Sequence, residues 1–207
     1  MMEVMTIFPT TIGKFKLDRN ISDDEMSVAY EEEKESELNI GDNSTGKNSY
    51  ILESPKLKNL KEFLVKSLNE FFYTLHGAYD DSVSLYITQS WFNYTKQNQS
   101  HHKHMHENSI ISGVFYFNAD VNSDSINMYA KNFLQGDHIN IPPKEVNIYN
   151  RECVILPAET GTLYLFNSKI PHDVSPTKNN DTRISLAFNS FVRGRIGIAK
   201  NKTELIL

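Results

Sequence analysis

The feature that most constrains the fold is a change of pattern after Asp81, where the chain becomes a series of short strand-like segments without helices between them. Asn, Asp, Gly and Pro turn signals separate these segments, and each segment is rich in β-branched or aromatic residues. Strands in such a series pair antiparallel, so the pattern predicts an antiparallel sandwich or jelly roll. The predicted strands are Val83–Tyr94, Ile110–Phe117, Ser125–Tyr129, Val146–Tyr149, Cys153–Leu156, Thr162–Phe166 and Arg183–Val192.

The first third of the chain has a different character. Met5–Leu17 is rich in β-branched and aromatic residues, and Pro9 within it favours an edge strand. Asp18–Asp42 is strongly acidic and has few apolar anchors, which predicts a solvated helix or a mobile loop. Ser54–Gly77 predicts one long helix, because apolar residues recur at helical spacing between a Ser-Pro start and a glycine stop. This helix is expected to cover the back of a sheet.

The length of 207 residues predicts a single domain. Within it, residues 1–80 are expected to supply an N-terminal strand, the acidic segment and a support helix, and residues 81–195 to form the β core. The connection from Asn118 to Pro143 is the place where a loop near an active site is expected.

Composition excludes several classes of protein. The net charge is −5 and no basic stripe stands out, so no nucleic-acid partner is expected. Cys153 is the only cysteine, which excludes an intramolecular disulfide and a disulfide-stapled secreted fold. The chain begins without a signal-peptide pattern and contains no apolar run of the length that spans a bilayer, so we expect no membrane association and a cytoplasmic location.

Four of the histidines fall in one short tract, at His101, His102, His104 and His106. In an extended backbone alternate side chains leave on the same side, so His102, His104 and His106 are expected on one face and His101 on the other. Two imidazoles two residues apart on one face are half of a metal site. A solvated histidine-rich loop is the alternative reading of the same tract.

The last predicted strand, Arg183–Val192, has two unlike faces. Apolar side chains alternate with a polar set that comprises Arg183, Ser185 and Asn189. If the polar face lines the mouth of the roll, Arg183 becomes a clamp for a carboxylate, which an arginine binds through two parallel hydrogen bonds. The alternative is a solvated, outward-facing edge, which the general scarcity of buried charge favours.

Several short motifs, taken in order, resemble the 2-oxoglutarate and Fe(II)-dependent oxygenases, and most closely the small prolyl-hydroxylase-like group of bacteria and their phages. The motifs lie between Val83 and Val192, and each is weak alone, whereas their order and spacing are fairly specific. They are Ser90–Asn93, His104–His106, Ser112–Phe117, Gly161–Phe166, His172 and Arg183–Asn189.

This resemblance implies a double-stranded β-helix, the jelly roll of the family, with iron at its open end and the long helix packed on the back of a sheet. His104 and His172 match the two histidine ligands of the iron. Arg183 matches the residue that binds the distal carboxylate of 2-oxoglutarate. Three further cosubstrate-binding residues are implied at Ser185, Tyr116 and Asn93.

His106 departs from the family pattern, which usually has Asp or Glu two residues after the first histidine ligand. Three neutral imidazoles would hold Fe(II) with one less negative charge, and they would also suit zinc. Three arrangements stay open: a site of His104, His106 and His172, a register in which His102 and His104 bind, and a carboxylate such as Glu107 in the third place. We favour the first, because its register begins the loop to the next strand as in the family.

The resemblance implies an enzyme that hydroxylates a C–H bond of a protein side chain, with proline as the family-level example, or of a small molecule. It would consume O2 and 2-oxoglutarate and release succinate and CO2. A cupin-like metalloprotein without 2-oxoglutarate chemistry is one alternative, although the spacing of Pro157, Gly161 and His172 does not fit the cupin pattern. A non-catalytic interaction protein on the same fold is another. Asp173 is either a support of the metal site or a solvated turn residue.

Overall fold

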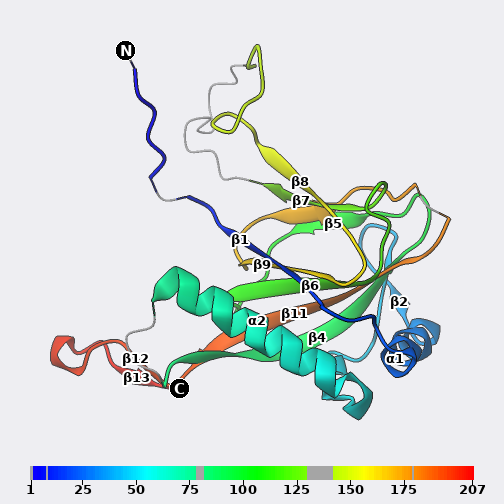
Figure 1. Ribbon diagram of the computed structural model, residues 1–207, viewed down its shortest axis with the longest axis horizontal. Coiled ribbons are helices and arrows are strands. Elements are labelled where there is room, and N and C mark those ends of the chain that lie inside the picture. The colour runs from blue at the N-terminus through cyan, green and yellow to red at the C-terminus, as the bar shows by residue number, and fades with distance from the viewer. Residues whose placement is uncertain (1, 8, 78–81, 130–141, 179) are drawn as a thin grey trace.

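The computed structural model describes residues 2–7, 9–77, 82–129, 142–178 and 180–207. Strands dominate, and two helices pack beside them (Figure 1). The helices are α1 (Asp23–Lys34) and α2 (Lys58–His76), with short 3-10 turns η1 (Ile51–Glu53), η2 (Pro55–Leu57) and η3 (Ala199–Asn201). The strands are β1 (Ile12–Lys16), β2 (Glu37–Leu38), β3 (Ser44–Thr45), β4 (Ser84–Thr95), β5 (His101–His104), β6 (Ile111–Asn118), β7 (Ser125–Tyr129), β8 (Cys153–Pro157), β9 (Thr162–Asn167), β10 (His172–Val174), β11 (Arg183–Arg193), β12 (Arg195–Ile196) and β13 (Leu205–Ile206).

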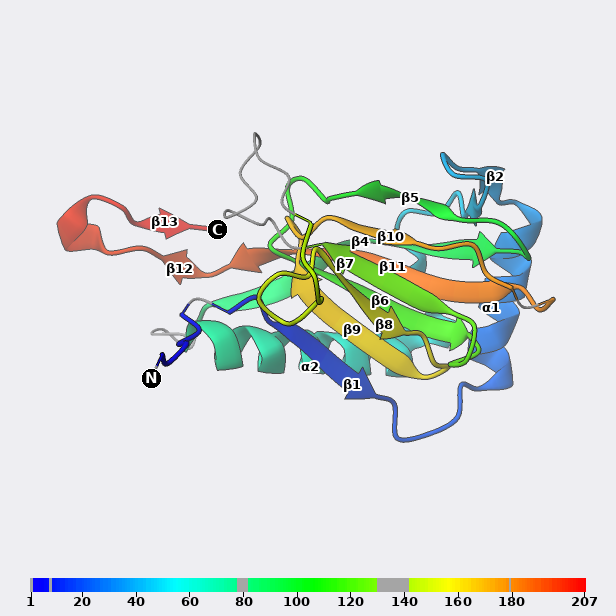
Figure 2. The ribbon, with the colours of Figure 1, turned by 90° about the horizontal axis from the view of Figure 1, so that it is seen from above.

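The strands form a jelly roll. The larger sheet has the order β1-β9-β6-β11-β4-β3-β2, and the smaller sheet has the order β5-β10-β7-β8. Figure 2 shows the smaller sheet over one face of the larger one, with α2 beneath the other face. Several early strands pair with late ones, as when β11 lies between β4 and β6. This pairing is the double-stranded β-helix that the family resemblance implied, and it agrees with the jelly roll predicted from the strand pattern.

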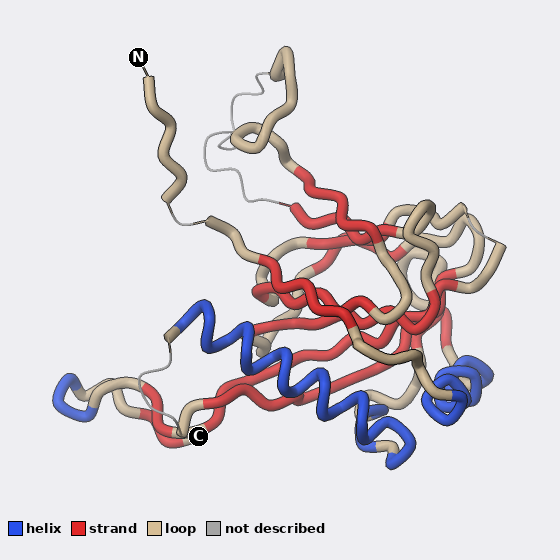
Figure 3. Tube along the Cα trace, in the orientation of Figure 1, coloured by secondary structure: helices blue, strands red, loops and turns tan. Residues whose placement is uncertain are grey.

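The main hydrophobic core lies between α2 and the larger sheet, and Figure 3 shows the helices on this side of the strands. Leu60, Leu64 and Leu68 of α2 are completely buried there, together with Leu186 and Phe188 of β11. The apolar residues that recur at helical spacing therefore pack in the core. Burial of each large apolar side chain stabilises the fold by roughly 2 kcal/mol.

The predicted long helix is present, but it begins later than expected. Residues 55–57 form the 3-10 turn η2, and the side chain of Ser54 caps neither element, so regular α-helix starts at Lys58. The C-terminal stop is as predicted, because Gly77 takes a left-handed conformation with φ of 54°. No helix among the described residues combines the length and apolar character that crossing a lipid bilayer requires.

The acidic segment is an ordered part of the fold. Ser22 caps α1 in a capping box with Glu25, whose buried carboxylate also binds Arg19 at 2.6 and 2.8 Å. The Tyr94 hydroxyl donates to the Ala29 carbonyl at 2.7 Å, which ties α1 to β4. The prediction of a helix is thus confirmed for Asp23–Lys34, where the mobile-loop alternative is wrong. Only the outer surface of this helix is solvated, because Val28 and Ala29 are buried.

Six of the seven strands predicted after Asp81 are present, and Val146–Tyr149 is not one of them. Asparagine side chains take the backbone donors there: the Tyr149 amide donates to Asn147 Oδ1 at 2.8 Å, and the Asn147 amide donates to Asn150 Oδ1 at 2.7 Å. Such local bonds favour a turn over a sheet ladder. Much of the expected active-site loop between Asn118 and Pro143 lies outside the described residues. The edge position predicted for the first strand is confirmed, because β1 ends the larger sheet.

Candidate metal centre

Three histidines converge at one end of the roll. His104 at the end of β5 lies opposite His172 of β10 in the ladder of the smaller sheet, and His106 follows two residues later. Candidate ligand nitrogens of these three residues all lie within 4.8 Å of one another. The Nε2 atoms of His104 and His106 are 3.1 Å apart, and the ring centroids of His104 and His172 are 4.3 Å apart.

An oxygen acceptor holds the Nδ1–H of each imidazole. His104 Nδ1 donates to the His102 carbonyl at 2.8 Å, and His172 Nδ1 donates to the Ile170 carbonyl at 2.9 Å. His106 Nδ1 donates to Asn189 Oδ1 on β11. Because the proton sits on Nδ1 in all three rings, each Nε2 keeps a free lone pair.

These lone pairs are available over a wide pH range. Burial lowers the pKa of His104 and His106, and it lowers the pKa of His172 to about 3. The unprotonated Nε2 atoms of His104 and His106 face each other across 3.1 Å, and a cation between them removes the repulsion of their lone pairs. The donor set therefore fits a divalent transition metal: three neutral nitrogens suit Fe(II), and they also suit zinc.

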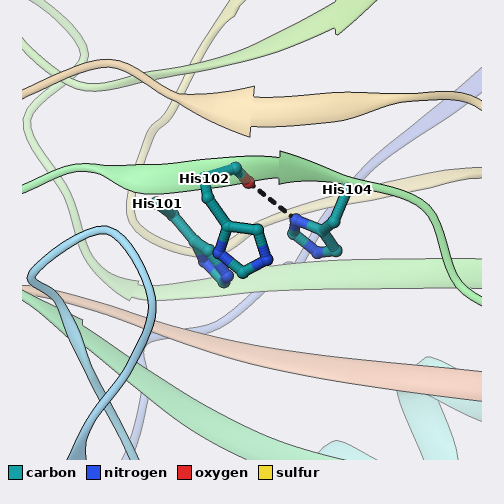
Figure 4. Close-up of side chains that lie close together, drawn as sticks. All are labelled: His101, His102 and His104. Carbon is teal, nitrogen blue, oxygen red and sulfur yellow. Dashed lines mark hydrogen bonds between the residues drawn. The ribbon is translucent and has the colours of Figure 1, made fainter.

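A second histidine group shares His104. Figure 4 shows the rings of His101, His102 and His104 on the same side of β5, and ligand atoms of this group also lie within 4.8 Å. Two of these rings already have partners outside the group, since His102 Nδ1 bonds the Ile40 carbonyl at 2.7 Å and His101 Nε2 contacts the Asn39 amide at 3.2 Å.

The expectation that His101 faces away from the other histidines is wrong. Its ring stacks on that of His104 with centroids 4.6 Å apart. The ladder between β5 and β10 is irregular at this point, with a register shift between the pairs of His172 and Val174, so strict alternation fails. Among the described residues, Glu107 belongs to neither group of candidate ligands.

Arg183 lies in the same cavity as the three histidines. It is 3% exposed, so the solvated-edge alternative is wrong and the polar face of β11 points into the roll. Its Nη2 donates to Thr95 Oγ1 at 3.0 Å and its Nη1 to the Ser125 carbonyl at 3.3 Å, while Nε is buried without a partner. Burial lowers the pKa of Arg183, although Tyr116 and Asp124 act in the opposite direction.

The other residues implied by the resemblance line this cavity too. Ser185 lies between Asn93 and Tyr116 in the larger sheet, because β11 pairs with β4 on one side and with β6 on the other. Asn93 Oδ1 is buried without a hydrogen-bond partner. Burial raises the pKa of Tyr116, so its hydroxyl keeps its proton and can donate a hydrogen bond to an anion.

Sequence reasoning missed the residues that support His106. Asn189 Oδ1 also accepts a hydrogen bond from Ser112 Oγ at 2.9 Å. Ser112 Oγ is also hydrogen-bonded to Ser168 Oγ at 2.8 Å. Asn189 lies on the same face of β11 as Arg183 and Ser185, and this shared face was the signal that identifies it.

Asp173 lies in β10, so it is not a solvated turn residue, and its support of the metal site is indirect. Its carboxylate accepts from the Tyr129 hydroxyl and from Asn127 Nδ2, both at 2.8 Å. Its side chain therefore ties β10 to β7, and this contact fixes the strand that carries His172.

A comparison with family models matches about half of the chain. A family model described as "Putative 2OG-Fe(II) oxygenase" matches residues 89–189, a range that contains the histidine triad, Arg183 and all three other cavity residues considered above. No curated protein sequence matches the chain.

Solved structures share the fold at low sequence identity. An oxidoreductase of the 2OG-Fe(II) oxygenase family from Burkholderia pseudomallei is 13% identical, with 86% of this chain and 84% of that chain covered and a TM-score of 0.53. A prolyl-4-hydroxylase from Pseudomonas putida is 11% identical (87% and 92% covered, TM-score 0.54). A prolyl hydroxylase from Trichoplax adhaerens, in complex with a peptide fragment of hypoxia inducible factor, is 10% identical (87% and 83% covered, TM-score 0.58).

Proposed function

We propose that this chain is a 2-oxoglutarate and Fe(II)-dependent oxygenase in which His104, His106 and His172 hold the iron. Arg183 then binds the distal carboxylate of 2-oxoglutarate, with Ser185, Tyr116 and Asn93 around the cosubstrate. The reaction we propose is hydroxylation of a C–H bond in a protein side chain, with proline as the first candidate. When bound, iron and 2-oxoglutarate supply the oxidation, which consumes O2 and releases succinate and CO2.

One observation carries this proposal: the cavity joins a cluster of free imidazole nitrogens to a buried, incompletely paired arginine. An isolated buried charge is costly, and the described residues place no carboxylate in an ion pair with Arg183. An anionic ligand that reaches the guanidinium offsets this cost. A dicarboxylate that also reaches the metal would use both ends of the cavity.

The protein's own part is to position ligands and to exclude water. Thr95 and the Ser125 carbonyl fix two guanidinium nitrogens of Arg183, so the remaining N–H groups are oriented before the ligand arrives. Asn189 fixes the ring of His106 in the same way. Val114, Ile126 and Phe166 line the apolar part of the cavity, which limits competition from water.

The first test measures 2-oxoglutarate binding and turnover. Metal-free protein is reconstituted with Fe(II), and we expect one iron per chain, binding of 2-oxoglutarate and slow formation of succinate without added substrate. Arg183→Ala should raise the dissociation constant for 2-oxoglutarate roughly 100-fold, because two charge-assisted hydrogen bonds are lost. Arg193→Ala is the matched control, since this arginine lies at the other end of β11 and binds Ser84 Oγ instead.

Absence of 2-oxoglutarate binding, or equal behaviour of the two arginine variants, would overturn the proposal. The substrate class needs a separate test. A peptide library that varies proline and its neighbours is incubated with the reconstituted enzyme, and mass spectrometry measures the gain of one oxygen atom. Modification of prolyl peptides supports the proposal. Hydroxylation that occurs only when small molecules replace the peptides contradicts its substrate part.

A further inference from the structure

The loop between β2 and β3 closes over the outer end of the histidine strand. The Ser100 amide and hydroxyl both donate to the Gly41 carbonyl, at 3.2 and 3.1 Å. His102 Nδ1 bonds the Ile40 carbonyl at 2.7 Å. At Gly41, φ is +104°, and an added Cβ would lie 2.8 Å from the backbone nitrogen of His102. A glycine therefore permits the close approach of the two backbones. The end of the acidic segment is therefore fixed against β5.

This loop determines which nitrogen of His101 carries the proton. The Ile40 amide donates to Asn39 Oδ1 at 2.8 Å, so the oxygen of the Asn39 side chain faces its own backbone. Its Nδ2 is then the atom 3.2 Å from His101 Nε2, and an amide nitrogen can only donate. A neutral imidazole that accepts at Nε2 holds its proton on Nδ1. His101 is thus a hydrogen-bond donor.

His101 is also part of the cavity wall. It lines the same cavity as the metal triad and Arg183, and its ring stacks on His104. Within the described part of the chain, no protein acceptor binds the Nδ1–H of His101. The cavity wall therefore includes a histidine with a neutral N–H donor that the family motifs do not include.

We propose that His101 donates its Nδ1–H to a carboxylate oxygen of bound 2-oxoglutarate, and that Asn39 is a positioning residue that keeps the proton on Nδ1. The inference rests on the proposed function, since it needs 2-oxoglutarate in this cavity. It also gives the acidic segment a role, because Asn39 lies at its end. One hydrogen bond to a charged group corresponds to roughly a tenfold change in affinity.

The test uses protein loaded with Mn(II), which is redox-inert here, and measures the dissociation constant of 2-oxoglutarate by calorimetry. His101→Phe keeps a flat ring and removes the N–H, and we expect a roughly tenfold weaker affinity with unchanged Mn(II) affinity. His76→Phe is the control and should change the constant less than about twofold, because His76 lies in the last turn of α2, among none of the residues that line the cavity.

Asn39→Asp replaces the donor with an acceptor, so His101 should move its proton to Nε2. Nitrogen NMR of histidine-labelled, metal-free protein distinguishes the two tautomers, and the affinity for 2-oxoglutarate should fall as in His101→Phe. If wild-type protein binds 2-oxoglutarate and both variants bind it equally well, the inference about His101 is wrong and the proposed function stands. If wild-type protein binds none, the proposed function fails as well.

Discussion

The two faces of β11 are a comparison within one strand. Phe188 is completely buried among the leucines of the helix layer, whereas the next residue, Asn189, faces the roll and holds His106. Arg183 and Ile184 differ in the same way. Because side chains alternate along a strand, one segment supplies both the core that stabilises the fold and the polar groups of the site. Substitutions at neighbouring positions should therefore affect different properties.

The largest expected effect is on the helix face. Phe188→Ala should lower the free energy of unfolding by about 3–5 kcal/mol, because it leaves a cavity in a completely buried region. Urea unfolding followed by circular dichroism measures this loss. The fraction that remains folded should still bind one metal ion per chain. A stability change below about 1 kcal/mol would show that the helix layer is not the main core.

The next effect lies on the roll side, in β10. His172→Ala should reduce the affinity for Fe(II) by more than about 100-fold, since even the loss of groups that support a ligand costs 10–100-fold. Metal analysis after gel filtration measures the bound iron. His76→Ala, at the end of α2, is the control and should retain full iron content. Full retention by His172→Ala would remove His172 from the site.

A smaller effect is expected at Asn189, the neighbour of Phe188. Asn189→Ala removes the acceptor of His106 Nδ1 and should weaken metal binding by roughly tenfold, with little change in stability. Asn189→Asp retains an acceptor oxygen and should restore the affinity. Titration with Co(II), followed by its visible absorption, measures both variants. Equal affinity in all three proteins would show that Asn189 does not position His106.

The smallest effect concerns pH and the helix layer. Burial opposes the charged form of Glu25, but the bonds from Arg19 and Ser22 outweigh it and lower the pKa of the carboxyl below its ordinary value of 4.5. This stabilisation is present above pH 4.5 and is lost as pH falls through the folded-state pKa. Below pH 4.5, the free energy of unfolding should depend less steeply on pH in Glu25→Gln than in the wild type. The slopes should differ by at most about 1.4 kcal/mol per pH unit. Identical slopes in the variant and the wild type would contradict this contribution.

Local sequence patterns predicted the helices and strands far better than the tertiary contacts that these elements make. The leucine spacing of α2 and the alternation in β11 identified a core face in each, because burial follows the period of the element. The start of α2 and the absent strand at Val146–Tyr149 were wrong for local reasons, since competing hydrogen bonds at Pro55–Leu57 and at Asn147 changed the backbone. The side to which His101 points was wrong because a register shift in the ladder has no signal in the sequence.

The sequence by itself indicated the fold class, the resemblance to a family and the candidate ligands, since strand spacing and ordered motifs are properties of the chain. Only the tertiary structure decided that the polar face of β11 is buried, because burial depends on the second sheet that covers it. It also brings Asn189 to His106 across 83 residues and Asn39 to His101 across 62. Contacts between residues so far apart in the chain follow from strand pairing, and no local pattern encodes them.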